Sequence, residues 1–318
     1  MIFKLGYIDG PISLPNNTFR TITYKIYKSL SKKEKNKRLT EIINNNLDNL
    51  LKILEFNKQE QINFYRISQA IIPLATLNEI DFDYITPYLE KWQKIGKFIK
   101  DNNMRIDIHP NQYCILNSPD KTVIKNSINS LKYIYSLFQA MDINGKAILH
   151  IGGKYDSKEE SLTRFKNNFQ NLPNHLKNII ILENDDKIYT LIDTLTICEE
   201  LNIPMVLDYH HYLCNNNKEN LKDYIPRIIN TWKNTNLNPK IHFSSPKSKK
   251  EFRSHNRFAG YKSFLKLINI LNNFNQDFDI MLECKEKDNA LFRLSKQLKY
   301  TKNIKYLNQS TFKITKKN

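Results

Sequence analysis

The chain has 318 residues, with 49 Lys and Arg against 32 Asp and Glu, which gives a formal net charge of +17. Hydrophobic residues make up 40% and aromatic residues 11%, which excludes a chain that is disordered throughout. Only 7 Gly and 11 Pro exclude collagen-like and low-complexity classes. The charge favours a polyanionic partner, although a genome rich in Asn, Lys and Ile codons would also add surface lysines without selection for binding.

The four cysteines are scattered and include no C-x-x-C pair, so neither a disulfide framework nor a thiolate zinc site is indicated. The first residues, Met1 to Pro11, lack the apolar run of a signal peptide. No stretch approaches the length of a membrane span. We therefore expect a reducing, cytoplasmic setting without membrane association, and no obligate protein partner is evident.

Short β-branched apolar runs alternate with amphipathic segments along the whole chain. Eight runs have the composition of strands: Phe3–Ile8, Asn63–Ser68, Arg105–His109, Ala147–Ile151, Ile179–Glu183, Met205–Tyr209, Lys240–Ser244 and Asp279–Glu283. Between them, helical spacing is clearest for Leu47 to Leu54, Ile124 to Tyr135, Leu191 to Cys198 and Phe264 to Leu271. Capping residues predict helix starts after Asp120 and Ser157.

This alternation predicts an α/β fold, a single (β/α)₈ TIM barrel. A doubly wound open sheet is the alternative, but the G-x-G-x-x-G turn that usually follows its first strand is not present. We expect one barrel domain over residues 1–300. Residues 301–318 read as a basic, loosely held C-terminal extension.

Metal-ligating residue types recur at the strand ends, where a TIM barrel places its working residues. The third to eighth runs and the residues just after them supply His109, His150, Glu183, Asp208, His211, His242, His255 and Glu283. Imidazole and carboxylate groups suit manganese, zinc or iron. A single strand histidine is more often an ordinary hydrogen-bonded residue, but the six consecutive strands together predict a cluster of two or three divalent ions with a bridging carboxylate.

Lys240 is unusual because period-two geometry places it on the same face as His242, inside a cationic site. A buried ammonium there would repel metal ions and lose its hydration. Either the side chain is displaced, or it pairs with a substrate phosphate, or it has become a carbamate that acts as a ligand. The alternative is a strand boundary shifted by one residue, with Lys240 reaching outward.

Clustered metals on a basic protein suggest phosphodiester hydrolysis, because one ion makes hydroxide from water and others neutralise the developing charge. The motifs that carry these ligands resemble those of the UV damage endonuclease family from residue 3 to about 298. They are Leu5-Gly6-Tyr7, Asp107 to Tyr113, Leu149 to Tyr155, Leu182 to Asp186, Asp208 to His211, Pro239 to Ser244, Ser254-His255 and Leu282 to Lys285.

The resemblance implies a DNA repair endonuclease that cuts the phosphodiester bond immediately 5′ of UV photoproducts (cyclobutane dimers and 6-4 photoproducts) in double-stranded DNA. It implies manganese as the usual ion, with zinc or magnesium possible, bound by the eight residues above. It also implies that Lys240 is carboxylated, that Glu183 and Lys240 are catalytic, and that Tyr7 lies near the scissile phosphate. Gln112 and Tyr113 match a pair of residues that probes the lesion.

The sequence departs from the family pattern in two places. Asp156-Ser157-Lys158 replaces the usual Gly-Asp-Lys, and Asn256-Arg257 replaces Ala-Asp after His255. The second change alters the residues that would orient His255.

Other residues are candidates for DNA contacts. Gln112 and Tyr113 follow a strand end on a loop, where a ring can stack on bases and an amide can hydrogen-bond to them. Asn111, Lys154, Arg66 and Arg257 complete the predicted DNA-binding set. Of two basic segments, Lys247 to Arg257 is favoured as a phosphate-binding rim, whereas Lys32 to Arg38 is at least as well explained as a solvated helix start.

Three other functions fit parts of the pattern. An AP endonuclease of the endonuclease IV type and a xylose isomerase-like sugar enzyme both use His and carboxylates at strand ends. The sugar enzyme predicts a neutral or acidic surface, which this chain lacks. A nucleic-acid-binding protein with a structural metal would instead group its ligands in sequence.

Overall fold

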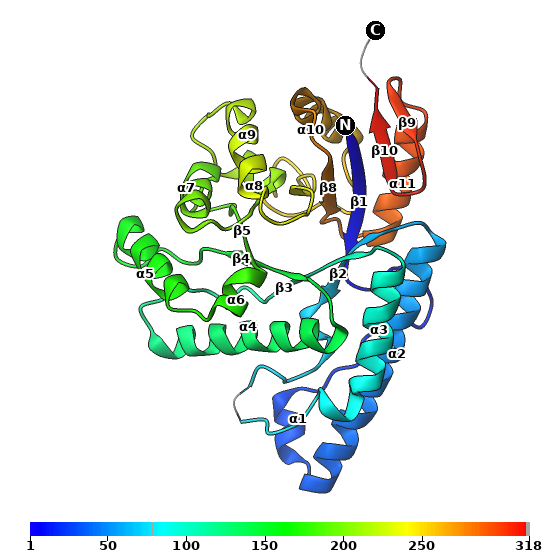
Figure 1. Ribbon diagram of the computed structural model, residues 1–318, viewed down its shortest axis with the longest axis vertical. Helices are drawn as coiled ribbons and strands as arrows, with labels where there is room; N and C mark the ends of the chain where they lie inside the picture. The colour runs from blue at the N-terminus through cyan, green and yellow to red at the C-terminus, as the bar shows by residue number, and fades with distance from the viewer. Residues whose placement is uncertain (78, 316–318) are drawn as a thin grey trace.

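The computed structural model describes residues 1–77 and 79–315. Eight parallel strands form a closed barrel with helices around it, as predicted (Figure 1). These strands are β1 (Ile2–Ile8), β2 (Phe64–Ser68), β3 (Arg105–His109), β4 (Lys146–His150), β5 (Ile180–Glu183), β6 (Met205–Asp208), β7 (Lys240–Phe243) and β8 (Phe278–Leu282). Each end lies within one residue of the predicted run, because a run of β-branched residues buried on both faces is the pattern of a parallel strand.

Helices connect the strands along the outside of the barrel. They are α1 (Tyr24–Ser29), α2 (Lys32–Gln59), α3 (Leu89–Asp101), α4 (Lys121–Met141), α5 (Lys158–Gln170), α6 (Asn174–Ile179), α7 (Leu191–Leu201), α8 (Tyr209–Cys214), α9 (Leu221–Thr231), α10 (Tyr261–Leu271) and α11 (Lys287–Lys299), with 3-10 turns η1 (Gln69–Ile71), η2 (Thr86–Tyr88) and η3 (Asn272–Phe274). Asp120 and Ser157 cap α4 and α5 as predicted. Within the described residues, no helix is long and apolar enough to cross a membrane.

The barrel closes where β1 meets its two neighbours. β1 pairs with β8 over five residues from Phe3 to Tyr7, but with β2 only at Tyr7 and Ile8. Gly6 makes the close approach possible, since a Cβ atom there would lie 2.4 Å from the carbonyl oxygen of Phe64. Closure therefore depends on a short contact at the C-terminal end of β1, next to the barrel mouth.

The C-terminal segment corrects one prediction. Residues 304–314 form a hairpin of β9 (Ile304–Tyr306) and β10 (Thr311–Ile314), and β10 pairs antiparallel with the start of β1. It occupies the edge of β1 that β2 leaves open, and the backbone nitrogen of Leu5 donates to the carbonyl of Ser310 at 2.7 Å. The segment is therefore not a loosely held extension up to residue 315, because it satisfies an otherwise open strand edge. Residues 316–318 lie outside the described part of the chain.

Truncating Phe312 should destabilise the whole barrel. Its ring is fully buried and stacks on Phe3 of β1 at 5.4 Å between centroids. We expect Phe312→Ala to lower the free energy of unfolding by about 3–5 kcal/mol. Urea unfolding followed by circular dichroism measures this change. Leu307→Ala in the same hairpin, where the side chain is 41% exposed, is the matched control and should cost less than about 1 kcal/mol; equal effects of both would mean that the hairpin is peripheral.

The barrel itself contains two clusters of buried hydrophobic residues. The main cluster lies between the strands and the helices, whereas Ile148, Ile181 and Val206 pack with Trp232 in a separate, smaller cluster. These three residues belong to β4, β5 and β6, and Trp232 follows α9. On the remaining strands, charged side chains instead of apolar ones fill the inside of the barrel. They continue as far as the site at the barrel mouth.

Candidate metal centre

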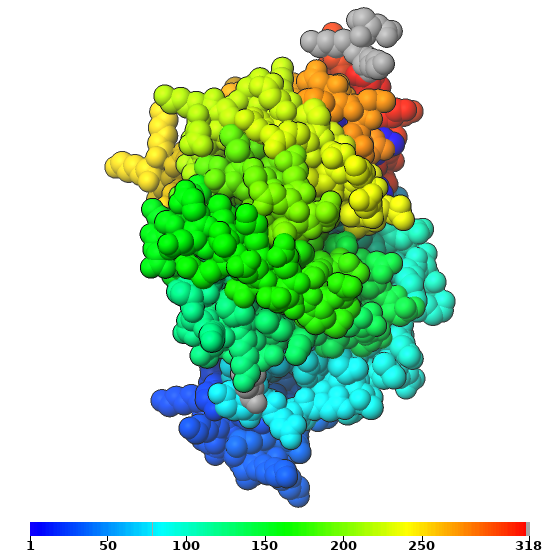
Figure 2. All heavy atoms as spheres, turned by 60° about the vertical axis from the view of Figure 1, so that its left-hand side comes forward, coloured from blue at the N-terminus to red at the C-terminus, as the bar shows by residue number. Residues whose placement is uncertain are grey.

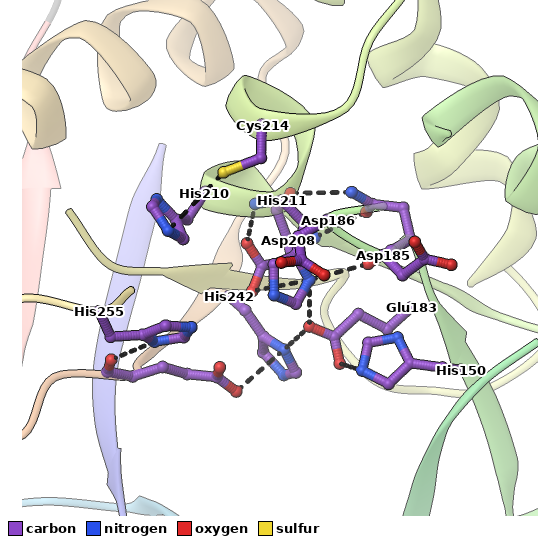
Figure 3. Close-up of polar contacts among 12 residues, drawn as sticks. His150, Glu183, Asp185, Asp186, Asp208, His210, His211, Cys214, His242 and His255 are labelled. Carbon is purple, nitrogen blue, oxygen red and sulfur yellow. Dashed lines mark hydrogen bonds and ion pairs between the residues drawn. The ribbon is translucent and has the colours of Figure 1, made fainter. Parts of the chain in front are cut away.

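Glu183, the last residue of β5, lies at the centre of the predicted ligands and is 1% exposed. One carboxylate oxygen, Oε2, lies 3.4 Å from Nε2 of His109 and 3.8 Å from Nε2 of His150. The other, Oε1, lies 2.8 Å from Nδ1 of His242 and 3.5 Å from Nδ1 of His211. Figure 3 shows His150 and His242 directed toward this carboxylate from different strands. The ends of β3, β4, β5 and β7 thus meet at one point.

Two groups of potential ligand atoms share Glu183. Their candidate donor atoms all lie within 4.8 Å of one another in each group: His109, His150 and Glu183 in the first, and Glu183, Asp208, His242 and Glu283 in the second. A carboxylate common to both groups has one oxygen for each side. The arrangement therefore fits two ions bridged by Glu183.

Three histidines are oriented by main-chain carbonyls. Nδ1 of His109 lies 2.7 Å from the carbonyl oxygen of Pro110, and Nδ1 of His211 lies 2.9 Å from that of Asn184. Nδ1 of His255 lies 2.8 Å from the carbonyl oxygen of Glu283. A carbonyl only accepts, so each Nδ1 carries a proton, and Nε2 is the atom that can offer a lone pair to an ion when the ring is neutral. This is how proteins present imidazole to a metal ion.

His242 lies between a hydrogen-bond donor, Arg66, and an acceptor, Glu183. Its Nε2 atom lies 2.7 Å from Nη2 of Arg66, which can only donate, so Nδ1 carries the proton and donates to Glu183. Burial lowers the pKa of His242 to about 4, and the neighbouring carboxylates oppose this shift only partly. The imidazole is therefore neutral, and binding of an ion at Nδ1 would release its proton.

Several buried polar atoms of the site have no hydrogen-bond partner among the described residues. They are Oε2 of Glu183, Oδ2 of Asp208 and Nδ1 of His150. An unpartnered buried oxygen is costly unless an ion or a water molecule satisfies it. Together with the oriented histidines, these atoms fit divalent cations, for which neutral imidazole and carboxylate oxygen are suitable donors.

The buried charges shift each other's protonation. Burial alone would raise the pKa of Glu183, but His242 and His150 outweigh it and hold that pKa well below its usual range. Burial raises the pKa of Asp208 well above its usual value, although His211 opposes it. Burial lowers the pKa of His211, but Asp208 and Glu183 outweigh it and raise the value to about 9. The site therefore carries carboxylates too close together to be favourable without cations.

Lys240 points into the barrel below His242 and is fully buried. Its ammonium forms an ion pair with Asp107 and lies 5.2 Å from the centre of the Phe64 ring. Burial lowers the pKa of Lys240 to about 7, although Asp107 opposes this shift. The side chain does not reach outward, so the strand boundary at Lys240 is as predicted.

The predicted probing loop lies open to solvent beside the centre. Tyr113 is 73% exposed, and Gln112 is also exposed. Asn111 accepts from the backbone nitrogen of Tyr113 at 2.9 Å, so its side chain shapes the loop. Lys154 is exposed after β4.

Two predicted DNA-binding arginines are engaged within the protein. Arg66 is 7% exposed and donates from Nη1 to Oε1 of Glu283 at 2.6 Å, besides its contact with His242. Arg257 donates from Nε to Oε1 of Glu286 at 2.8 Å. Arg66 therefore belongs to the metal centre, where it neutralises Glu283, and not to an open phosphate-binding surface.

The structure does not bring Tyr7 to this cluster. Tyr7 is fully buried, and its hydroxyl donates to Oδ1 of Asn57 on α2 at 2.6 Å. Successive strand residues alternate between the two faces, so Tyr7 packs with Leu5 and Phe3 against the helices. Its position gives no support to the predicted role near the scissile phosphate.

Asp107 was not singled out in the sequence as a residue of the site, although its spacing from His109 indicates its position. It precedes His109 by two residues, so it lies on the same inner face of β3 one layer deeper. His210, which we did not count among the ligands, is buried and lies 3.2 Å through Nε2 from the carbonyl oxygen of Arg253. It ties the loop that carries His255 to α8.

Comparisons with known proteins show the family of this chain. Residues 3–314 match the family model of the UV-endonuclease UvdE. A UV DNA damage endonuclease of Bacillus cereus (strain B4264) is 40% identical over 308 residues, which cover 96% of this chain and 97% of that protein. The crystal structure of SacUVDE superimposes with a TM-score of 0.85 at 34% identity, over 93% of this chain and 98% of that one.

A more distant likeness concerns the fold alone. The structure of endonuclease IV from Thermus thermophilus matches with a TM-score of 0.56 at 10% identity, over 94% of this chain and all of that one. The match to the family model over residues 3–314 and the 40% identity to the Bacillus cereus protein show a much closer relationship than this likeness of fold. This chain belongs to the UV-endonuclease (UvdE) family.

Proposed function

We propose that this protein hydrolyses the phosphodiester bond immediately 5′ of UV photoproducts in double-stranded DNA, with two or three divalent ions, manganese first among them. Membership of the family supports the reaction class. The single structural observation that carries the metal site is the orientation of His109, His211 and His255, each with Nδ1 bonded to a main-chain carbonyl so that Nε2 is the atom left for an ion. Since cellular DNA is the substrate, we expect the protein to act in the cytoplasm.

The proposed ligands divide around Glu183. His109 and His150 would hold one ion with Glu183, and Asp208, His242 and Glu283 would hold another. When bound, such ions supply hydroxide near neutral pH and neutralise charge on the phosphate and the leaving oxygen. His211 and His255, whose rings lie 6.1 Å apart beside these groups, are the candidates for a third ion.

The residues of the chain itself have definite tasks in this proposal. Glu183 separates and orients the two ligand groups, and Arg66 keeps Glu283 ionised and directed toward His242. Lys240 is proposed as the carboxylated lysine: its low pKa leaves a share of neutral amine near pH 7 that can add to CO₂ with loss of one proton. The resulting carbamate retains one N–H, which could still donate to Asp107.

We propose that Gln112 and Tyr113 probe the stacking of the duplex at the lesion. Both side chains are exposed on the loop that follows His109, so they adjoin the ligand cluster in sequence and in space. A planar ring can replace a lost stacking partner, and a damaged step is cheaper to open than an intact one. Asn111, Lys154 and Arg257 stay as proposed DNA contacts at the same rim.

The substrate test uses purified protein with manganese and three end-labelled duplexes that carry a cyclobutane dimer, an abasic site or no lesion. We expect a cut immediately 5′ of the dimer and none in the intact duplex. Cleavage of the abasic duplex alone would assign the endonuclease IV reaction instead. Binding without any cleavage, with metal present, would favour a nucleic-acid-binding protein with a structural metal.

Removing the Tyr113 ring should weaken discrimination between damaged and intact DNA. The ring is 73% exposed, so Tyr113→Ala costs little stability, but it removes a stacking surface worth about 1–3 kcal/mol per base. We expect the ratio of affinities for dimer-containing and intact duplexes to fall by roughly tenfold or more. Fluorescence anisotropy measures both affinities. Tyr300→Ala, at a tyrosine that is 79% exposed on the C-terminal side of α11, is the control, and an unchanged ratio in Tyr113→Ala would refute the probing role.

A further inference from the structure

A helical arm projects beside the barrel mouth. We define the arm as residues 18–41, which contain α1 and the first turns of α2. α2 has 28 residues and so measures about 42 Å, whereas the five residues of β2 span roughly 17 Å. Because α2 ends only four residues before β2 begins, its surplus of roughly 25 Å extends past the barrel on the side of the mouth. Figure 1 shows this arm at the end of the molecule opposite the two termini, and Figure 2 shows it projecting from the surface in blue.

The arm is held firmly at its base. The side chain of Asn46, fully buried on α2, accepts from the backbone nitrogen of Arg20 at 2.7 Å and donates to its carbonyl at 2.9 Å. The same side chain donates to the carbonyl of Ile71 at 2.8 Å. A small cluster of Ile22, Leu39 and Ile42 packs against the loop that follows η1. The arm is therefore an ordered projection and not a frayed helix end.

The arm carries unpaired positive charge. Residues 18–41 contain eight Lys and Arg but only two acidic residues, and seven of the eight basic side chains are exposed. Among the described residues, its one ion pair joins Arg38 to Glu41 at 3.8 Å, while Glu34 caps α2 through Ser31. Charges of one sign held this close repel each other, and a bound polyanion would relieve that repulsion.

The predicted phosphate-binding rim behaves differently. In residues 247–257, Lys247 pairs with Glu251, Arg253 with Asp186 and Arg257 with Glu286. Basic side chains that are already paired with carboxylates release fewer counterions when they bind a polyanion, so they contribute less to its affinity. Among the described residues, three of the five basic side chains of this segment are thus in ion pairs, against one of the eight in the arm.

The base of the arm is continuous with the metal centre. Both border a cavity of about 550 Å³, whose wall includes Thr21 and Ile22 of the arm together with Arg66, His109 and Asn111. A polyanion that reaches the ligand cluster therefore passes the arm at short range.

We propose that the arm binds the phosphate backbone of duplex DNA on one flank of the incision site. The inference rests on the proposed function for its partner, and it adds a surface that the metal centre and the probing loop do not supply. At 3.4 Å per base pair, the roughly 25 Å by which α2 extends past the barrel corresponds to the length of about seven base pairs. The arm thus lengthens the footprint and supplies affinity that does not depend on the lesion.

The test compares two variants with the same loss of charge. The arm variant combines Lys28→Gln, Lys32→Gln, Lys33→Gln and Lys37→Gln. The control variant combines Lys296→Gln, Lys302→Gln, Lys305→Gln and Lys313→Gln at the opposite end of the molecule. All eight side chains are exposed, and none forms an ion pair within the described residues, so neither variant should lose its fold.

Affinity for an intact duplex with about 15 base pairs on each side of its centre is measured against salt concentration. We expect the arm variant to bind about tenfold or more weakly at low salt, with a slope of log K against log salt that is smaller by about two to four. The control variant should change affinity less than about threefold. Equal losses in both variants, or none in the arm variant, would overturn the proposal.

Shortened duplexes locate the contact. With about five base pairs left on each side, the difference between the arm variant and the unmodified protein should vanish, and duplexes shortened on one side identify the flank. A difference that persists on the short duplex would overturn a flank contact. The outcome is separable from the proposed function: failure of the unmodified protein to cut a dimer-containing duplex would refute the reaction, whereas these binding ratios stand or fall without any cleavage.

Discussion

Glu183→Gln should abolish incision while DNA binding persists. The substitution keeps the size of the side chain but replaces the one carboxylate that both ligand groups share, with four histidines within 3.8 Å of its oxygens. An amide supplies one oxygen instead of two and no charge, so the two groups can no longer be bridged. We expect the incision rate to fall by at least about 10³-fold, corresponding to roughly 4 kcal/mol of lost transition-state stabilisation.

The control is the same Glu-to-Gln substitution at a position outside the metal centre. Glu199→Gln removes a carboxylate that pairs with Arg227 at 2.7 Å between two outer helices, and it should leave the rate within about twofold. Single-turnover incision and anisotropy on the same dimer-containing duplex separate catalysis from affinity. A parallel loss of rate and affinity in Glu183→Gln would mean that the cluster is structural.

Breaking the ion pair between Asp107 and unmodified Lys240 should strongly destabilise the metal-free protein. Both side chains are fully buried and in contact. Asp107→Leu leaves Lys240 near Arg105 without its counter-charge, and Lys240→Met leaves the carboxylate of Asp107 buried. We expect each to lower the free energy of unfolding by about 3–5 kcal/mol.

The double variant Asp107→Leu/Lys240→Met provides the internal control. Because it removes both charges, its free energy of unfolding should lie within about 2 kcal/mol of that of the unmodified protein. Urea unfolding of all four proteins in a chelator completes the cycle without bound metal. If the two single effects simply add in the double variant, the ion pair does not carry the stability assigned to it.

The barrel and the ligand cluster were predictable because local rules govern both. Runs such as Arg105–His109 and Met205–Asp208 are recognisable as strands by composition, and a parallel barrel brings the ends of all strands to one rim. His109 and Glu183 could therefore be placed together although 74 positions separate them in the sequence. Ligands such as these two could be placed from the strand that each one ends, whereas His211 and His255 lie beyond the ends of their strands.

What escaped the sequence depends on pairings between distant segments. Strand β10 (Thr311–Ile314) pairs with the start of β1, and nothing in the composition of β10 predicts which strand it pairs with. Arg66 was expected to be open to phosphate, but Glu283, 217 positions away, engages it. Whether a basic segment is neutralised depends on such partners too, which is why a larger share of the basic side chains is free on the arm than in residues 247–257.

The most direct test of the central claim is a metal titration of incision. Protein stripped with a chelator is titrated with manganese while bound metal per chain and the cutting rate of a dimer-containing duplex are both measured. We predict no cutting without metal, and a rate that rises only as two or three ions bind per chain. Undiminished cutting by the stripped protein, or a full rate with a single ion, would contradict the account of a Glu183-bridged metal centre.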